Sequence, residues 1–154
     1  MSDETVVVQF KVDGIPAPAG SKRGFVNRRT GGVIITDASK RAKPWQARVA
    51  AAASEAMSGE LLAGPLELTL TFTFPRLPSH FGTGRNAGSL RASAPALPAV
   101  RPDVTKLVRA VEDALTGIVW RDDAQVIAQH AYKGYGASAG CEIEVRSLEP
   151  AEAS

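Results

Sequence analysis

The stretch Leu66-Glu67-Leu68-Thr69-Leu70-Thr71-Phe72-Thr73-Phe74 alternates apolar and polar residues without a break. Side chains along a β-strand point to opposite faces in turn, so this alternation predicts a strand with one buried and one solvent-facing side. It is the clearest strand signal in the chain. The other expected helices and strands lie before and after it in the sequence.

Two amphipathic helices are expected on either side of this strand in the sequence. Residues 44–57 repeat apolar residues at helical spacing, with Pro44 suited to a first turn and Gly59 to a stop. Residues 103–116 form the second predicted helix, and Gly117 ends it. Its core-facing stripe consists of Val104, Leu107, Val108, Val111 and Leu115.

Short β-rich segments complete the pattern. Residues 5–12 read as a strand, and residues 22–27 and 32–36 read as a hairpin. Two closing strands, 125–132 and 141–146, are expected around a glycine-rich turn. The predicted order is β-β-β-α-β-α-β-β, which is an α+β domain with a mixed sheet and two main helices.

A chain of 154 residues suits one domain, expected over residues 1–146, with a flexible tail at 147–154. Residues 75–102 hold many prolines and glycines and no sustained periodicity. A loop of this length in a compact domain is usually functional or disordered. Because it contains several arginines and no acidic residue, it is predicted to be a mobile loop that orders on binding phosphates; a merely disordered insert is the alternative.

The overall formal charge of +2 conceals an asymmetric distribution. Residues 21–109 carry fourteen Lys or Arg and five acids, whereas residues 110–154 carry three bases and eight acids. A cationic surface with a few carboxylates set into it suits a metal-dependent nuclease. Scattered, solvated charge is the alternative interpretation.

Several classes of function are disfavoured by what the sequence lacks. No apolar run approaches the roughly 18 residues of a membrane span, and the acidic first residues do not resemble a secretory signal, so a cytoplasmic protein without a membrane partner is expected. Cys141 and two histidines are too few for a structural zinc site. The glycines between Gly14 and Lys22 have the wrong spacing for a P-loop, so no nucleotide cofactor is expected.

Chain length suggests which acidic residues can meet. The helix at 103–116 rises about 21 Å at about 1.5 Å per residue, and an extended return over 117–123 covers about 23 Å. We therefore expect Asp122 and Asp123 to come back toward Asp103. Because neighbouring residues of an extended segment face opposite ways, only one of the pair should point at the site.

By the same measure, Asp113 lies about 15 Å from Asp103 along the helix, too far to share one ion with it. Two converging carboxylates beside cationic side chains suit Mg²⁺. Arg109, on the polar helix face, could stabilise the charge of a transition state. The alternative is structural: Asp103 caps the helix, and Asp122 and Asp123 form a turn.

Three segments share a distinctive pattern: RPDVTKLVR from residue 101, EDALTG from residue 112 and VWRDDAQV from residue 119. Two more lie upstream, GIPAPAGSKR from residue 14 and RLPSHFGTGRN from residue 76. In these segments the chain resembles the RusA family of Holliday junction resolvases, particularly members encoded by phages and prophages. The resemblance covers about residues 6–145, and its specific part is the block 103–126.

The resemblance implies a small homodimeric endonuclease that depends on Mg²⁺, for which Mn²⁺ could substitute. It implies binding to branched DNA, namely four-way junctions, and symmetric nicking of opposing strands during recombination and repair. A bacterial or phage-infected cell is the expected setting.

The catalytic residues are carried over position by position. Asp103 matches the first family Asp and Asp123 the third, both as expected metal ligands, with Asp122 as a further candidate. Arg109 stands where the family usually has Lys. The expected DNA-binding residues are Lys22, Arg23, Arg76, Arg85, Arg91, Arg101 and Lys106.

One position departs from the family pattern. Thr105 occupies the place of the second Asp, and a neutral hydroxyl is a poorer ligand for a hard cation. Glu112, seven residues later on almost the same helix face, could compensate in part. The sequence therefore predicts a junction-resolving endonuclease, with two alternatives: a branched-DNA-binding protein of the same fold that cleaves weakly or not at all, and a nuclease for other branched or flap DNA.

Overall fold

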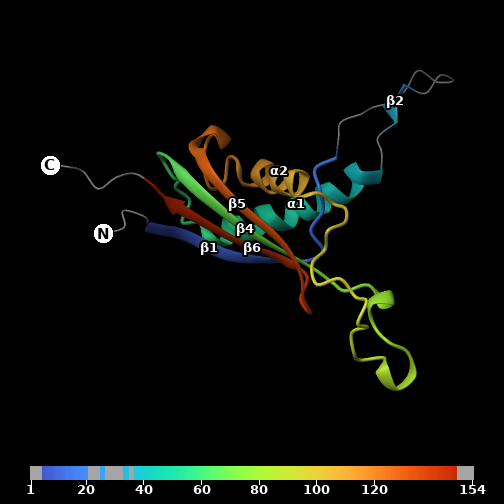
Figure 1. Ribbon diagram of the computed structural model, residues 1–154. Helices are drawn as coiled ribbons and strands as arrows, with labels where there is room; N and C mark the ends of the chain where they lie inside the picture. The colour runs from blue at the N-terminus through green and yellow to red at the C-terminus, as the bar shows by residue number, and fades with distance from the viewer. Residues whose placement is uncertain (1–4, 21–24, 27–32, 35–36, 149–154) are drawn as a thin grey trace.

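The computed structural model describes residues 5–20, 25–26, 33–34 and 37–148. A four-stranded sheet forms its centre (Figure 1). Across the sheet lie β1 (Thr5–Asp13), β6 (Gly140–Ser147), β4 (Leu66–Phe74) and β5 (Val126–Tyr135). Because β4 is antiparallel to β6 and parallel to β5, the predicted mixed sheet and the α+β class are confirmed.

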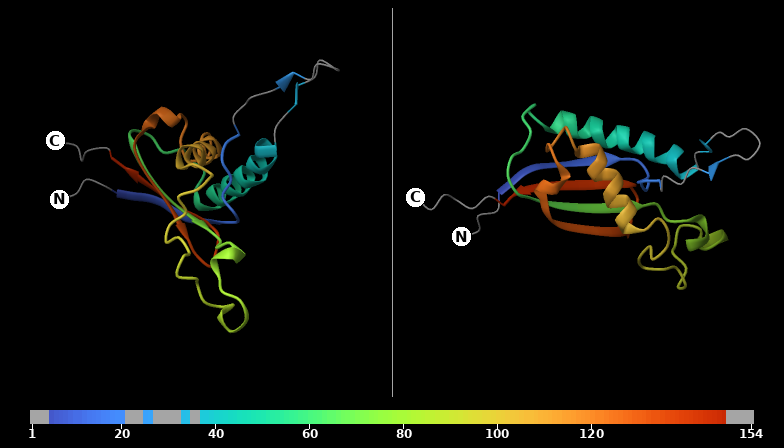
Figure 2. Two further views of the ribbon diagram at one scale, coloured as in Figure 1. Left: turned by 45° about the vertical axis from the view of Figure 1, so that its right-hand side comes forward. Right: turned by 90° about the horizontal axis from the view of Figure 1, so that it is seen from above.

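Two helices cover one face of this sheet, as Figure 2 shows from two sides. They are α1 (Asp37–Ala56) and α2 (Val104–Leu115), and they also contact each other. Gln46 of α1 donates through Nε2 to the carbonyl of Ala110 in α2 at 3.0 Å. The element order agrees with the predicted β-β-β-α-β-α-β-β order.

The core lies between the helices and the sheet. In β4 every apolar residue is buried, whereas the alternating Glu and Thr residues lie on the open face and are partly or fully exposed. The helices contribute buried residues such as Trp45, Val49, Leu107 and Val111. Cys141 belongs to the same core; burial raises the pKa of its thiol to about 12, which removes it as a candidate nucleophile.

Helix α1 begins earlier than predicted. It starts at Asp37, seven residues before Pro44, which lies inside the helix instead of in its first turn. Pro44 is exposed and lacks an N–H, so one helical hydrogen bond is missing. Burial of Trp45 and Val49 stabilises the helix through tertiary packing, which sequence-local signals do not record.

The predicted hairpin is present in a shorter form. β2 (Phe25–Val26) pairs antiparallel with β3 (Val33–Ile34) as a two-stranded sheet separate from the central one. The other residues of the predicted hairpin strands lie outside the described part of the chain.

Strand β5 runs past the predicted end at residue 132. Lys133 and Gly134 remain in the strand because they pair with Phe72 and Thr73 of β4. The turn to β6 is correspondingly short. The strand β6 extends to Ser147, so the predicted tail begins inside it, and residues 149–154 lie outside the described chain.

Residues 75–102 form an arm that projects beyond the end of the sheet (Figure 1). The arm contains two short 3-10 turns, η1 (Pro78–His80) and η2 (Gly84–Asn86). Its predicted mobility stays a prediction. Within the described residues, no helix has the length and apolar character that crossing a bilayer requires.

Candidate functional site

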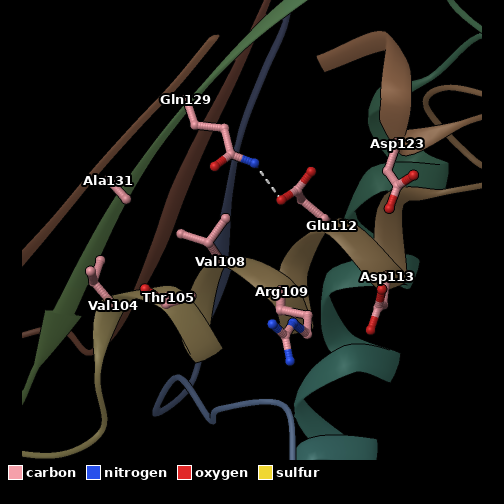
Figure 3. Close-up of a pocket in the computed structure, with 9 residues that line it drawn as sticks. All are labelled: Val104, Thr105, Val108, Arg109, Glu112, Asp113, Asp123, Gln129 and Ala131. Atoms are coloured by element: carbon pink, nitrogen blue, oxygen red, sulfur yellow. Dashed lines mark hydrogen bonds between the residues drawn. The ribbon is translucent and has the colours of Figure 1, made fainter. Parts of the chain in front are cut away.

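A cleft of about 400 Å³ opens between α2 and the edge strand β5 (Figure 3). Polar and charged side chains from both elements, and from the segment before β5, face this cleft. The lining residues are Val104, Thr105, Val108, Arg109, Glu112, Asp113, Asp123, Gln129 and Ala131.

The helical repeat explains the α2 side of the cleft. Thr105, Arg109 and Glu112 recur at intervals of four and three residues, so they share one face of the helix. Leu107 and Val111 occupy the opposite stripe and are fully buried in the core. The apolar stripe thus orients α2 and turns its polar face toward β5.

Asp123 enters the cleft from the turn η3 (Asp123–Gln125), which immediately precedes β5. The neighbouring Asp122 is used differently, because its Oδ1 accepts the N–H of Ala124 at 2.8 Å and caps this turn. Gln125 fixes the turn further by donating through Nε2 to the carbonyls of Leu62 and Gly64. Only one carboxylate of the pair lines the cleft.

The expectation that residues 117–123 return from the helix as an extended segment is wrong. The N–H of Gly117 bonds to the carbonyl of Trp120 at 2.7 Å, and those of Ile118 and Val119 bond back to Leu115, so the chain turns tightly. Trp120 is fully buried, and its anchoring holds this turn against the core. The return is therefore shorter than an extended segment.

Asp123 therefore lines the same cleft as Glu112 and Asp113 of the C-terminal half of α2, and its charge acts on Glu112. Asp113, expected to lie too far from Asp103 to share an ion with it, lines the same cleft as Asp123. Figure 3 shows both carboxylates at this end of the helix.

Asp103 is the N-cap of α2. Its Oδ1 accepts the N–H of Lys106 at 2.8 Å, and it is not among the residues that line the cleft. Nine residues separate it from Glu112, about 13.5 Å along the helix axis. The expected convergence of Asp103 with Asp122 and Asp123 stays a prediction, and the capping interpretation describes the contact that Asp103 makes through Oδ1.

The surroundings of Glu112 in the cleft change the pKa of its carboxyl group. Burial raises its pKa above the usual value, and the nearby charges of Asp123 and Asp113 raise it further. A hydrogen bond from Gln129 Nε2 to Glu112 Oε1 acts in the opposite direction and orients the carboxylate. The negative charges of Asp123 and Asp113 close to Glu112 mark a place where an added positive charge would be favourable.

The arm carries most of the predicted DNA-binding residues. Arg76 lies over the ring of Tyr135, with its Cζ 4.3 Å from the ring centroid, and also donates to the carbonyl of Pro95. Arg91 Nε donates to the carbonyl of Phe81 at 2.7 Å. The remaining predicted residues fall into two groups: Arg85, Arg101 and Lys106 are exposed, and Lys22 and Arg23 lie outside the described residues.

Three residues of β5 contribute contacts that sequence reasoning missed. Gln129 orients Glu112, Tyr135 stacks against Arg76, and Lys133 Nζ donates to the carbonyls of Val100 and Pro102 at 2.8 and 2.9 Å. The available signal was that they are even numbers of residues apart, which places them on one side of a strand. That side faces α2 and the base of the arm.

The family model described as endodeoxyribonuclease RusA matches residues 16–146. The chain belongs to the RusA family. The matched region includes the cleft, the arm and both helices, so it spans the whole candidate site.

A relative from Bacillus subtilis (strain 168), "Uncharacterized protein YqaN", is 27% identical over 141 residues. The alignment covers 92% of this chain and 96% of the relative. The similarity to this RusA-like chain therefore extends over nearly the full length of both proteins.

Proposed function

We propose that this protein is a Mg²⁺-dependent endonuclease that resolves four-way DNA junctions by symmetric cleavage, with a role in recombination and repair in the cytoplasm of a bacterial or phage-infected cell. The supporting observation is the cleft that Arg109, Glu112 and Asp123 line together, in a chain of the RusA endodeoxyribonuclease family. The acid-free arm beside it supplies a surface for the DNA backbone.

The donor chemistry of the cleft fits Mg²⁺. Within the described chain, no three His, Cys, Asp or Glu side chains are grouped closely enough to hold a metal. Mg²⁺ usually takes one or two carboxylates, keeps waters and adds substrate phosphate oxygens, so a complete protein cage is not required. We assign Asp123 as a ligand, with Glu112 as the neighbouring carboxylate.

When bound, Mg²⁺ supplies a Lewis acid for a phosphate oxygen and lowers the pKa of a coordinated water. The protein contributes orientation and charge. Gln129 holds the Glu112 carboxylate in place, and Arg109 provides a fixed positive charge for the phosphate oxygens as negative charge builds on them. Asp103 stays a predicted ligand, with one carboxylate oxygen not used by the cap.

The DNA-binding surface that we propose continues from the cleft onto the arm. Lys133 ties the end of the arm to β5 directly before α2, so the arm and the cleft are joined at their base. The proposed phosphate contacts are Lys22, Arg23, Arg76, Arg85, Arg91, Arg101 and Lys106.

The direct test compares a synthetic four-way junction with a linear duplex of matched sequence. We expect paired nicks in the junction that require Mg²⁺ or Mn²⁺, and little cutting of the duplex. If neither substrate is cut while the junction is still bound, the alternative of a branched-DNA-binding protein replaces the proposed activity.

Replacing Thr105 by Asp is expected to lower the Mg²⁺ concentration needed for half-maximal cleavage. Thr105 lines the cleft, and an Asp there adds a full negative charge to the available oxygen donors. Glu112→Gln is expected to raise the requirement, because it removes the carboxylate beside Asp123. Mg²⁺ titrations of junction cleavage measure both effects, and Glu142→Gln on the exposed face of β6 is the control.

An unchanged metal requirement in both variants would exclude Thr105 and Glu112 from the neighbourhood of the ion. Cleavage seen in Thr105→Asp alone, with an inactive natural protein, would instead favour the DNA-binding alternative.

The protein is expected to sediment as a homodimer of about twice the 16.2 kDa chain mass at micromolar concentration. A four-way junction has two equivalent scissile positions, and a two-fold symmetric protein presents one site to each. Analytical ultracentrifugation measures the mass directly. A strict monomer, both free and bound to junction DNA, would be incompatible with symmetric cutting.

A further inference from the structure

A second cavity, open to solvent and about 600 Å³ in volume, lies within the arm and apart from the cleft between α2 and β5. It is formed by residues 82–93, around the turn η2. The side chains relevant to binding are Thr83, Asn86, Ser89, Leu90, Arg91 and Ser93.

The loop around this cavity is closed by its own backbone. Phe81 and Leu90 form an antiparallel bridge, and the N–H of Gly82 bonds to the carbonyl of Ser89 at 3.0 Å. The N–H of Ser89 bonds in turn to the carbonyl of Asn86, also at 3.0 Å. These bonds shape the tip of the arm into a closed ring.

Glycine is required at one point of this ring. A Cβ on Gly82 would lie 2.6 Å from Asn86 Cβ and 2.7 Å from the Asn86 carbonyl oxygen. The close approach sets Asn86 against the start of the loop. Arg91 is also held in place, because its Nε donates to the carbonyl of Phe81 across the base of the ring.

The side chains around the cavity can make the kinds of contact that a nucleotide requires. An amide at Asn86 and the hydroxyls of Thr83 and Ser89 can donate to and accept from the edges of a base. Leu90, which is 50% exposed, offers an apolar surface for a base face, and Arg91 offers a positive charge for a phosphate. No acidic residue occurs anywhere in residues 75–102 to repel the DNA backbone.

We propose that this cavity receives a single unstacked nucleotide from the branch point of the DNA substrate. This inference rests on the proposed function, because it takes branched DNA as the ligand. A base beside a branch point has weaker stacking and pairing than a base inside a duplex, so its extrusion costs less free energy. The arm would thereby distinguish a junction from linear DNA by the availability of a base that can be extruded.

The test uses 2-aminopurine, a base whose fluorescence rises when it leaves the stack. It is placed in turn at each position flanking the branch point of a synthetic four-way junction, and the DNA is saturated with protein in the absence of divalent cations to prevent cleavage. We expect a several-fold rise at one or more of these positions. The same base in the middle of a linear duplex should show no rise.

Two cavity variants and one matched control assign the effect to the cavity. Asn86→Ala and Leu90→Ala are expected to abolish most of the rise at saturating protein. Leu97→Ala removes an equally large side chain from the same arm, but Leu97 does not line the cavity and is 66% exposed, so the full rise should remain. Thermal unfolding confirms that each variant is folded.

The inference is overturned if the saturated junction shows no rise at any flanking position, or if both cavity variants retain the full rise. Intact binding and cleavage under either outcome leave the proposed function standing. A protein that does not bind the junction at all contradicts both the inference and the proposed function, so the two failures are distinguishable.

Discussion

Asp123→Asn is expected to reduce cleavage of a four-way junction by about 10²-fold or more, which corresponds to about 3 kcal/mol of lost transition-state stabilisation. Asp123 lines the cleft beside Glu112, and its carboxylate is the proposed metal ligand at the end of the tight turn after α2. Junction affinity should be unchanged or higher, because the variant removes a negative charge near phosphate. Single-turnover cleavage and a binding titration measure the two effects separately.

Asp122→Asn is the matched control, since it removes the same charge one residue away. Asp122 caps η3 through Ala124 and does not line the cleft, and Asn caps about as well as Asp. Cleavage by this variant should therefore remain close to that of the natural protein. Equal losses in both variants, or none in Asp123→Asn, would contradict the assignment of Asp123.

Asp103→Asn tests the position carried over from the family motif. Asn preserves the cap on Lys106, so the helix should stay folded while one carboxylate is lost. We expect cleavage to fall here as well. Loss in Asp123→Asn but not in Asp103→Asn would confine the metal centre to the Asp123 end of the cleft.

Raising the salt concentration from about 50 to about 200 mM is expected to weaken junction binding about 10³-fold, if about six or more phosphates are contacted. The physical reason is counterion release, which makes affinity fall steeply with each neutralised phosphate. The arm and the start of α2 supply this charge, with Arg85, Arg101 and Lys106 exposed. Fluorescence anisotropy at several salt concentrations gives the slope of log affinity against log salt concentration.

Single substitutions measure how much each residue contributes to this salt dependence. Arg85→Ala should weaken binding and reduce the slope by about 1, the value expected for one lost phosphate contact. Lys11→Ala, an exposed charge on β1 outside the arm, should leave the slope unchanged. A nearly flat salt dependence of the natural protein would argue against DNA binding through this surface.

Local sequence signals predicted the helices and strands whose formation depends on residues close together in the sequence. The alternation in β4 fixed its buried face, and the apolar stripe with Gly117 at its end fixed α2. Boundaries that depend on distant partners were missed. β5 continues through Gly134 because β4 pairs with it, and α1 begins at Asp37, before Pro44, because its packing on the sheet stabilises it.

The candidate site likewise has a part that the sequence predicts and a part that it does not. The sequence by itself determined that Thr105, Arg109 and Glu112 share one helix face, because the helical period is local. It could not determine which carboxylate meets them, since that depends on a compact turn around the buried Trp120. The tertiary structure placed Asp123 beside Glu112, because packing of the buried Trp120 in the core fixes a tight turn after α2 where the local sequence pattern indicated an extended segment.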